Sequence, residues 1–296
     1  MTPRAALLFT AGLLAAPPLA AQADKAVEAE YERVAQIADA DSAGTAERVA
    51  AARLARYLRR FDDARYYLAR AERMARSGGD RNQVLSENLW LHLATGAGIG
   101  VVQQVFAEEH AEHPMPPTVV AGWLNAFPEL LVGGAWDTLV TRLRSDAEDE
   151  AYRCACYAQR AWMHRAAGRP DLARIYWDSL AATRREVPDG LTAFEEAEWR
   201  ARVARDLARA GRVDEARNEL ARADAIEVTD LERIQVIRRR AQAWAELGEV
   251  DRAVADLAYL LSVPSEVTRA SLRTRLTWAP IRDDPRFQAL QKEPAG

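Results

Sequence analysis

The chain has 296 residues, enough for two ordinary domains or for one extended array of repeats. Its formal net charge of −4 argues against general nucleic-acid binding, which needs a strongly basic face. Two cysteines are too few for a disulfide-stapled scaffold. Beyond the N-terminus no apolar stretch reaches the roughly 18 residues that a membrane-spanning helix needs.

The first residues have the pattern of a secretory signal peptide. Arg4 precedes an apolar run over residues 5–16, and Ala21–Ala23 forms an A-x-A cleavage pattern. We therefore expect a signal peptide over residues 1–23, cleavage after Ala23, and a mature chain of residues 24–296 that is periplasmic or secreted. The alternatives are an uncleaved N-terminal anchor or a buried helix.

Three phrases of similar sequence begin at glycines, and a fourth lacks the glycine. They are GRPDLARIYWDSL from Gly168, GRVDEARNELARA from Gly211, GEVDRAVADLAYL from Gly248 and FDDARYYLARAER from Phe61. Apolar residues at helical spacing on both sides of each glycine predict a helix, a turn and a second helix. Glycine supplies the left-handed conformation that ends the first helix, and an early aspartate suits the start of the second.

The repeated units share an order of residue types: small, aromatic, glycine, alanine, aromatic, alanine. This order resembles the motif of the tetratricopeptide repeat family, whose unit is a helical hairpin of about 34 residues. The resemblance implies an all-α, right-handed α-solenoid of about six or seven stacked hairpins over residues 24–296. The clearest repeats are expected at 44–75, 151–186, 194–225 and 230–263. The matching residues are Ala161, His164, Gly168, Ala173, Trp177 and Leu180, then Ala204, Leu207, Gly211, Ala216, Leu220 and Ala223, then Ala241, Trp244, Gly248, Ala253, Leu257 and Leu260, with a fourth set at Ala52, Phe61, Ala64, Leu68 and Ala71.

The middle of the chain is less regular, and we interpret it as two divergent hairpins of the same array. The second of them is expected around Gly133 and Gly134. The alternative is a division into two domains at the HPMPP sequence of residues 113–117.

The C-terminal residues 265–292 are predicted to form a capping tail. Asp284 followed by Pro285 is a helix start, and Trp278, Ile281 and Phe287 can cover the open edge of the last hairpin. The phrase LTWAPIRDDPRFQAL resembles the C-terminal end of the extracytoplasmic repeat region of bacterial Ser/Thr kinases. The glycine-rich loop, HRD and DFG signatures of a kinase are absent from the chain.

The FAEEHAEHP sequence is the best candidate for chemistry. Glu109, His110 and His113 can share a helix face and hold a metal, although the H-E-x-x-H zinc motif is absent. Cys154 and Cys156 point to nearly opposite sides of a helix, so they cannot form an unstrained disulfide with each other. An exposed redox or metal thiol pair is the alternative to the favoured interpretation, in which at least one of them is a small buried side chain. We expect no enzyme activity, no cofactor and no metal; the alternative is a metal-binding or hydrolytic protein using these histidines.

In arrays of the family that this chain resembles, the first helix of each hairpin lines a concave groove. The arginines among the expected groove positions suit a protein or peptide with acidic groups or a free carboxylate. The family's lysine-based clamp for chaperone tails has no counterpart here. We therefore predict a non-catalytic adaptor or assembly factor of the bacterial cell envelope, with structural self-association as a third hypothesis. The expected groove residues are Trp162, Arg165, Glu198, Arg205, Arg209, Gln235, Arg238 and Gln242.

Overall fold

The computed structural model describes residues 17–131, 150–184 and 186–292, and in these ranges all regular secondary structure is helical. The all-α expectation is confirmed. The N-terminal half holds α1 (Pro17–Asp39), α2 (Thr45–Tyr57), α3 (Phe61–Met74), α4 (Gly78–Thr95), α5 (Ile99–Glu112), α6 (Pro117–Ala126) and the 3₁₀ helix η1 (Pro128–Leu131). The C-terminal half holds α8 (Glu150–Ala166), α9 (Pro170–Thr183), α10 (Ala193–Arg209), α11 (Val213–Asp224), α12 (Asp230–Glu246), α13 (Val250–Ser262), α14 (Arg269–Thr274), η2 (Leu276–Ile281) and α15 (Pro285–Leu290).

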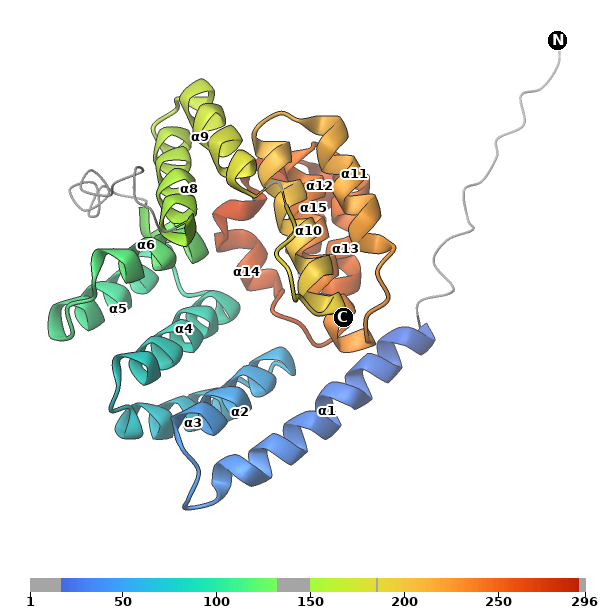
Figure 1. Cartoon of the computed structure of the whole chain (residues 1–296). Coiled ribbons are helices and arrows are strands. Elements are labelled where there is room, and N and C mark those ends of the chain that lie inside the picture. The colour runs from blue at the N-terminus through green and yellow to red at the C-terminus, as the bar shows by residue number, and fades with distance from the viewer. Residues whose placement is uncertain (1–16, 132–149, 185, 293–296) are drawn as a thin grey trace, which may run out of the picture.

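Consecutive helices pack against each other as hairpins, namely α2 with α3, α8 with α9, α10 with α11, and α12 with α13. Figure 1 shows the hairpins following one another along a curve, with α14 on its inner side. Gly133 and Gly134, the expected turn of the second middle hairpin, lie outside the described residues. None of the described helices combines the length and apolar character needed to cross a membrane.

The turns of the three glycine-containing hairpins have the expected backbone conformation. Gly168, Gly211 and Gly248 have φ of 69°, 80° and 72°, the left-handed region that side chains disfavour. In the α2–α3 turn Arg59 takes this role at φ 60°, at a cost of roughly 1–2 kcal/mol. The Arg59 side chain donates to the carbonyl oxygen of Leu261 at 3.0 Å, so this strained turn also ties α2 to the end of α13.

The alanines and large apolar residues of the repeated phrases form the core, as expected. Ala216 and Leu220 are both fully buried, and Trp177 meets Trp162 edge to face with ring centroids 5.6 Å apart. Small residues let the helix backbones approach, and the large side chains fill the space one turn further on. One apolar cluster contains Phe106 as well as Trp177, so the core continues across the HPMPP sequence.

The C-terminal cap forms as expected. Trp278, Ile281 and Phe287 are 3%, 2% and 0% exposed, and they pack in the cluster formed by α12 and α13. An Asp284 carboxylate oxygen accepts a hydrogen bond from the backbone N–H of Arg286 at 2.9 Å, with Pro285 in the first turn of α15. The tail therefore covers apolar surface that the last hairpin leaves open.

The tail also crosses the inner side of the curve, a role not anticipated from the sequence. We call residues 263–282 the C-terminal segment. Thr268 donates to the carbonyl oxygen of Ala94 at 2.9 Å, and the backbone N–H of Leu276 donates to a Glu129 carboxylate oxygen at 2.8 Å. Helix α14 packs on α4, and α1 packs on α12. The segment thus connects the two halves of the chain across the inside of the curve (Figure 1).

Candidate functional site

Polar residues form one stripe on α10 and another on α12. On α10 the stripe contains Glu198, Arg202, Arg205 and Arg209, which are three or four residues apart and therefore share a helix face. On α12 it contains Gln235, Arg238, Arg239, Gln242 and Glu246. We call this pair of stripes, together with Trp162 and Arg165 of α8, the inner face.

The structure brings the predicted groove residues of these helices together. Arg165 and Arg209 both bind Glu246, at 2.9 Å and 2.8 Å. Arg205 donates to the side-chain oxygen of Gln242 at 3.2 Å. These contacts link α8, α10 and α12 through side chains alone.

The remaining predicted residues join the same network. The guanidinium carbon of Arg209 lies 4.6 Å from the ring centroid of Trp162, a cation–π distance. Arg238 donates to Gln235 at 3.2 Å, and Glu198 accepts from Arg239 at 2.9 Å.

Accessibility divides the predicted groove residues into two groups. Trp162 and Gln242 are 5% exposed, and the Arg209 side chain 3%, so their contacts hold the helices together. The side chains of Arg165 and Glu198 are 29% and 20% exposed and within reach of a ligand. A binding role for the eight residues stays a prediction.

Positive charge is in excess on the inner side of the curve, although the whole chain has a net charge of −4. Among the described residues, ten arginines share six carboxylates there. The pairings are Glu87 with Arg53 and Arg56, Glu129 with Arg275, Glu198 with Arg202 and Arg239, Asp206 with Arg184, Arg205 and Arg209, Glu246 with Arg165 and Arg209, and Glu266 with Arg238.

Asp206 is the most heavily shared of these carboxylates. It is fully buried, and it pairs with Arg184, with Arg205 at 3.1 Å and with Arg209 at 3.8 Å. Burial by itself raises the pKa of Asp206, but the three arginines outweigh burial and hold the pKa below its ordinary value. The carboxylate therefore stays ionised and anchors three guanidinium groups.

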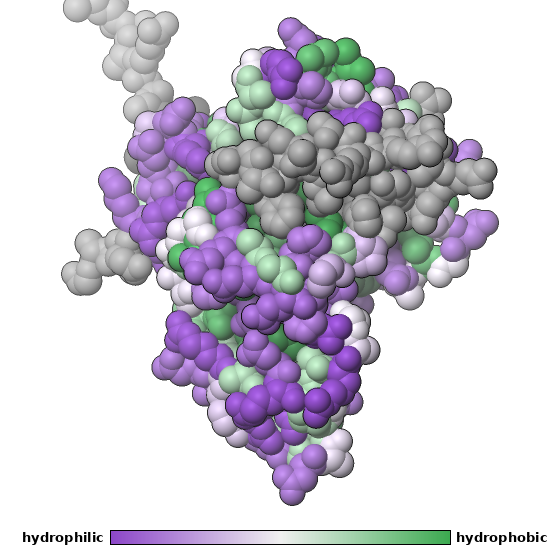
Figure 2. Space-filling view, turned by 90° about the vertical axis from the view of Figure 1, so that its left-hand side faces the viewer, coloured by the Kyte–Doolittle hydropathy of each residue, from purple (hydrophilic) through white to green (hydrophobic). Residues whose placement is uncertain are grey.

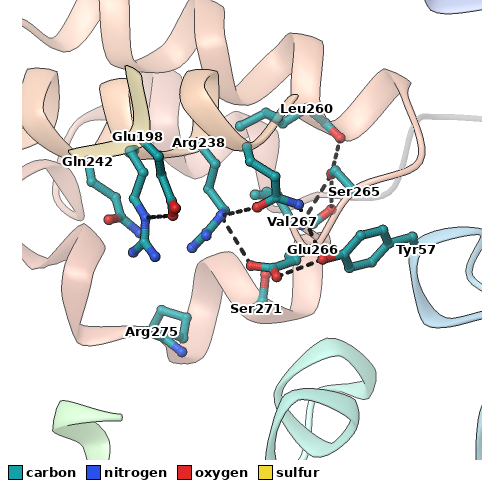
Figure 3. Close-up of polar contacts among 12 residues, drawn as sticks. Tyr57, Glu198, Arg238, Gln242, Leu260, Ser265, Glu266, Val267, Ser271 and Arg275 are labelled. Carbon is teal, nitrogen blue, oxygen red and sulfur yellow. Dashed lines mark hydrogen bonds and ion pairs between the residues drawn. The ribbon is translucent and has the colours of Figure 1, made fainter. Parts of the chain in front are cut away.

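Glu266 of the C-terminal segment lies against the inner face (Figure 3). The Tyr57 hydroxyl donates to one of its carboxylate oxygens at 2.9 Å, and Nε of Arg238 lies 3.1 Å from the other. Burial opposes ionisation, yet Arg238 and Arg56 lower the pKa of Glu266 to about 2. The Ser265 hydroxyl, which donates to the carbonyl of Leu260 at 2.6 Å, fixes the turn that carries Glu266.

The arginines of the inner face and Arg275 of the C-terminal segment also repel one another. Burial and the nearby charges of Arg238 and Arg205 hold the pKa of Arg239 well below its ordinary value. Burial lowers the pKa of Arg275 as well. Arg238 and Arg205 lower this pKa further, whereas Glu129 and Glu266 raise it. Burial is the largest cause of both shifts, and the neighbouring arginines add to it.

Some residues of this network could have been found from the sequence. Arg202, Arg239 and Glu246 continue the two stripes at helical spacing, so helical periodicity is a sufficient signal for them. No sequence signal points to Glu266 or Arg275, because both reach the inner face only through the path of the C-terminal segment.

The histidine sequence of the alternative hypothesis forms local contacts. His110 Nδ1 accepts from the backbone N–H of Met115 at 3.1 Å, and His113 Nδ1 lies 3.2 Å from Glu109. Within residues 17–131, 150–184 and 186–292, no group of three or more His, Cys, Asp or Glu side chains is placed to hold a metal. Beside His113 there is a recess of about 400 Å³ between α3, α4 and α5.

Cys154 and Cys156 are 6% and 0% exposed. The Sγ atom of Cys154 lies 3.1 Å from the Thr183 hydroxyl oxygen. The prediction that at least one of them is a small buried side chain is confirmed.

On the part of the surface that Figure 2 shows in colour, hydrophilic residues predominate and hydrophobic residues form small patches. A scan against protein-family models, a search of curated proteins and a search of solved structures find no match to this chain. The charge distribution of the inner face therefore carries the functional argument.

Proposed function

We propose that this protein is a non-catalytic binding protein of the bacterial cell envelope. In this proposal it is a right-handed solenoid of tetratricopeptide type, and its inner face holds an acidic segment of a partner protein. The excess of arginine over carboxylate on the inner face carries the proposal. Guanidinium groups bind carboxylates with two parallel hydrogen bonds, and a partly desolvated site strengthens such contacts.

The accessible arginines give the first contact points for an acidic partner. The side chains of Arg165 and Arg202 are 29% and 37% exposed, and they lie on α8 and α10. The C-terminal segment takes up part of the inner side, so the partner segment is short or ends there.

A capture experiment from envelope extract tests this function. The baits are the wild type, the inner pair Arg165→Gln with Arg202→Gln, and an outer pair Arg174→Gln with Arg217→Gln. The side chains of the outer arginines, on α9 and α11, are 59% and 49% exposed. Their replacement removes the same number of positive charges as the inner pair.

We expect one acidic protein to bind the wild type and the outer pair, and to bind the inner pair at least about tenfold more weakly. With the purified partner, the affinity is expected to fall as ionic strength rises. Equal capture by the inner pair, with an unchanged circular dichroism melt, would show that the inner face is not the binding site.

Export is the second part of the proposal, and it predicts the mature N-terminus. Val27, Tyr31, Val34 and Ala38 carry the buried face of α1, and all four follow Ala23. Removal of residues 1–23 therefore leaves this packing in place. After expression with the native N-terminus in a Gram-negative host, intact-mass measurement is expected to find a periplasmic chain that starts at Asp24. A cytoplasmic chain that retains residues 1–23 would contradict export.

A further inference from the structure

Arg238 and Arg239 of the inner face have guanidinium nitrogens that make no hydrogen bond to described residues. The hydrogen bonds that Arg238 and Arg239 make to described residues run through Nε, to Gln235 at 3.2 Å and to Glu198 at 2.9 Å. The two terminal nitrogens of each guanidinium are therefore left for a ligand or for solvent. The two side chains are 10% and 22% exposed, so they are largely buried but still within reach of solvent.

Arg275 faces these groups from the C-terminal segment. Figure 3 shows it across from Arg238. Its guanidinium lies over the ring of Trp90 at 4.6 Å and its Nε is 3.2 Å from Glu129, so its orientation is fixed. The side chain is 9% exposed, and its Nη1 is buried without a hydrogen-bond partner. Buried donors are nearly always satisfied in folded proteins, so this nitrogen needs an acceptor from solvent or from a ligand.

The carboxylates that face these arginines are already engaged. Glu198 is shared with Arg202, and Asp206 is shared among three arginines. Glu266 also accepts from Tyr57, and Glu129 also accepts from the backbone of Leu276. Each of these two carboxylates keeps one buried oxygen, Oε2, without a hydrogen bond to a described residue. Bringing so many cations together in a poorly solvated place is unfavourable unless an anion joins them.

The directions of the donors indicate the shape of that anion. Arg205 lies on α10, and Arg238 and Arg239 lie on α12. Arg275, from the C-terminal segment, lies across from Arg238 in Figure 3. A carboxylate offers two oxygens in one plane and a single charge. A phosphate group offers oxygens in several directions and up to two charges, which suits guanidinium groups that converge from different elements.

We infer that the inner face contains a binding site for the phosphate group of inorganic phosphate or of a phosphate monoester, formed by Arg205, Arg238, Arg239 and Arg275. The site shares the inner face with the proposed function but needs no protein partner. The ligand is compact because the C-terminal segment crosses this side of the curve.

Isothermal titration calorimetry of the purified exported protein tests the site directly. Inorganic phosphate and phenyl phosphate are titrated separately, with acetate as a planar, singly charged comparison. We expect saturable one-to-one binding of phosphate and at least tenfold weaker binding of acetate. The tighter of the two phosphate ligands identifies the source of the group.

Arg239→Gln is the decisive variant, and Arg217→Gln on α11 is its control. Arg239→Gln is expected to weaken phosphate binding at least tenfold, whereas Arg217→Gln leaves it unchanged. In buffer without multivalent anions, the melting temperature of Arg239→Gln is expected to equal or exceed that of the wild type. The variant removes a cation that Arg238 and Arg205 repel, and Glu198, which loses Arg239, keeps its ion pair with Arg202 at 3.4 Å.

A lower melting temperature for Arg239→Gln would instead show a structural arginine and overturn the inference. Absence of saturable phosphate binding, or wild-type affinity in Arg239→Gln, would do the same. The titration uses the protein alone, so its failure leaves the capture of an acidic partner unaffected. A failed capture experiment likewise leaves phosphate binding standing.

Discussion

Replacing Asp206 by asparagine is expected to lower the free energy of unfolding by about 3–5 kcal/mol. The side chain is fully buried and pairs with Arg184, Arg205 and Arg209. Asparagine keeps the shape but removes the charge, so three arginines in poorly solvated positions lose their common counter-ion. The cost is large because a buried charge without its partner keeps the penalty of leaving water.

Urea unfolding at neutral pH, followed by circular dichroism, measures this loss. Asp178→Asn is the matched control, because Asp178 is 58% exposed and makes one ion pair of 3.4 Å with Arg212. The control is expected to change the free energy of unfolding by less than about 1 kcal/mol. If Asp206→Asn also changed it by less than 1 kcal/mol, Asp206 would not be the anchor of the inner arginines.

Replacing Glu266 by glutamine is expected to destabilise the protein by roughly 3 kcal/mol at pH 6–7. The pKa of Glu266 is lowered from 4.5 to about 2, since Arg238 and Arg56 outweigh the effect of burial. A carboxyl group whose pKa is lowered by folding makes its full contribution to the stability of the folded state at pH values above its unfolded-state pKa of 4.5. The contribution is lost as the pH falls toward 2.

The difference in unfolding free energy between the wild type and Glu266→Gln is therefore expected to shrink with acid. By about pH 3 it should be less than half of its value at pH 6. Urea titrations at several pH values between 3 and 7 measure it. Glu72→Gln, a change at an exposed position on α3, is the control and is expected to have little effect. A difference that stayed constant down to pH 3 would show that the Glu266 ion pair does not hold the C-terminal segment in place.

The repeated hairpins could be predicted because their determinants are local. Gly211 ends α10 in the left-handed conformation, and Ala216 and Leu220 follow it at helical spacing on the buried face of α11. Each of these properties depends on a few neighbouring residues. The start of α15 at Asp284 and Pro285 was predictable for the same reason.

The candidate site was predictable in part. The stripe on α10 follows from helical periodicity, which groups Glu198, Arg205 and Arg209 on one side. The same period reaches Arg202, which the sequence prediction omitted. Periodicity cannot state which members of a stripe are accessible, because that depends on what packs opposite. Arg165 is 29% exposed and the Arg209 side chain 3%, although both bind Glu246.

The sequence by itself determined the helical class, the hairpins with their glycine turns and the capping helix, because local spacing and backbone conformation encode them. Only the tertiary structure decided that the C-terminal segment crosses the inner side of the curve. There Glu266 meets Tyr57, 209 residues away in the chain, and Arg275 meets Glu129. The physical reason is that such contacts depend on how hairpins that are distant in the chain are oriented relative to one another, which leaves no trace in any one segment of sequence.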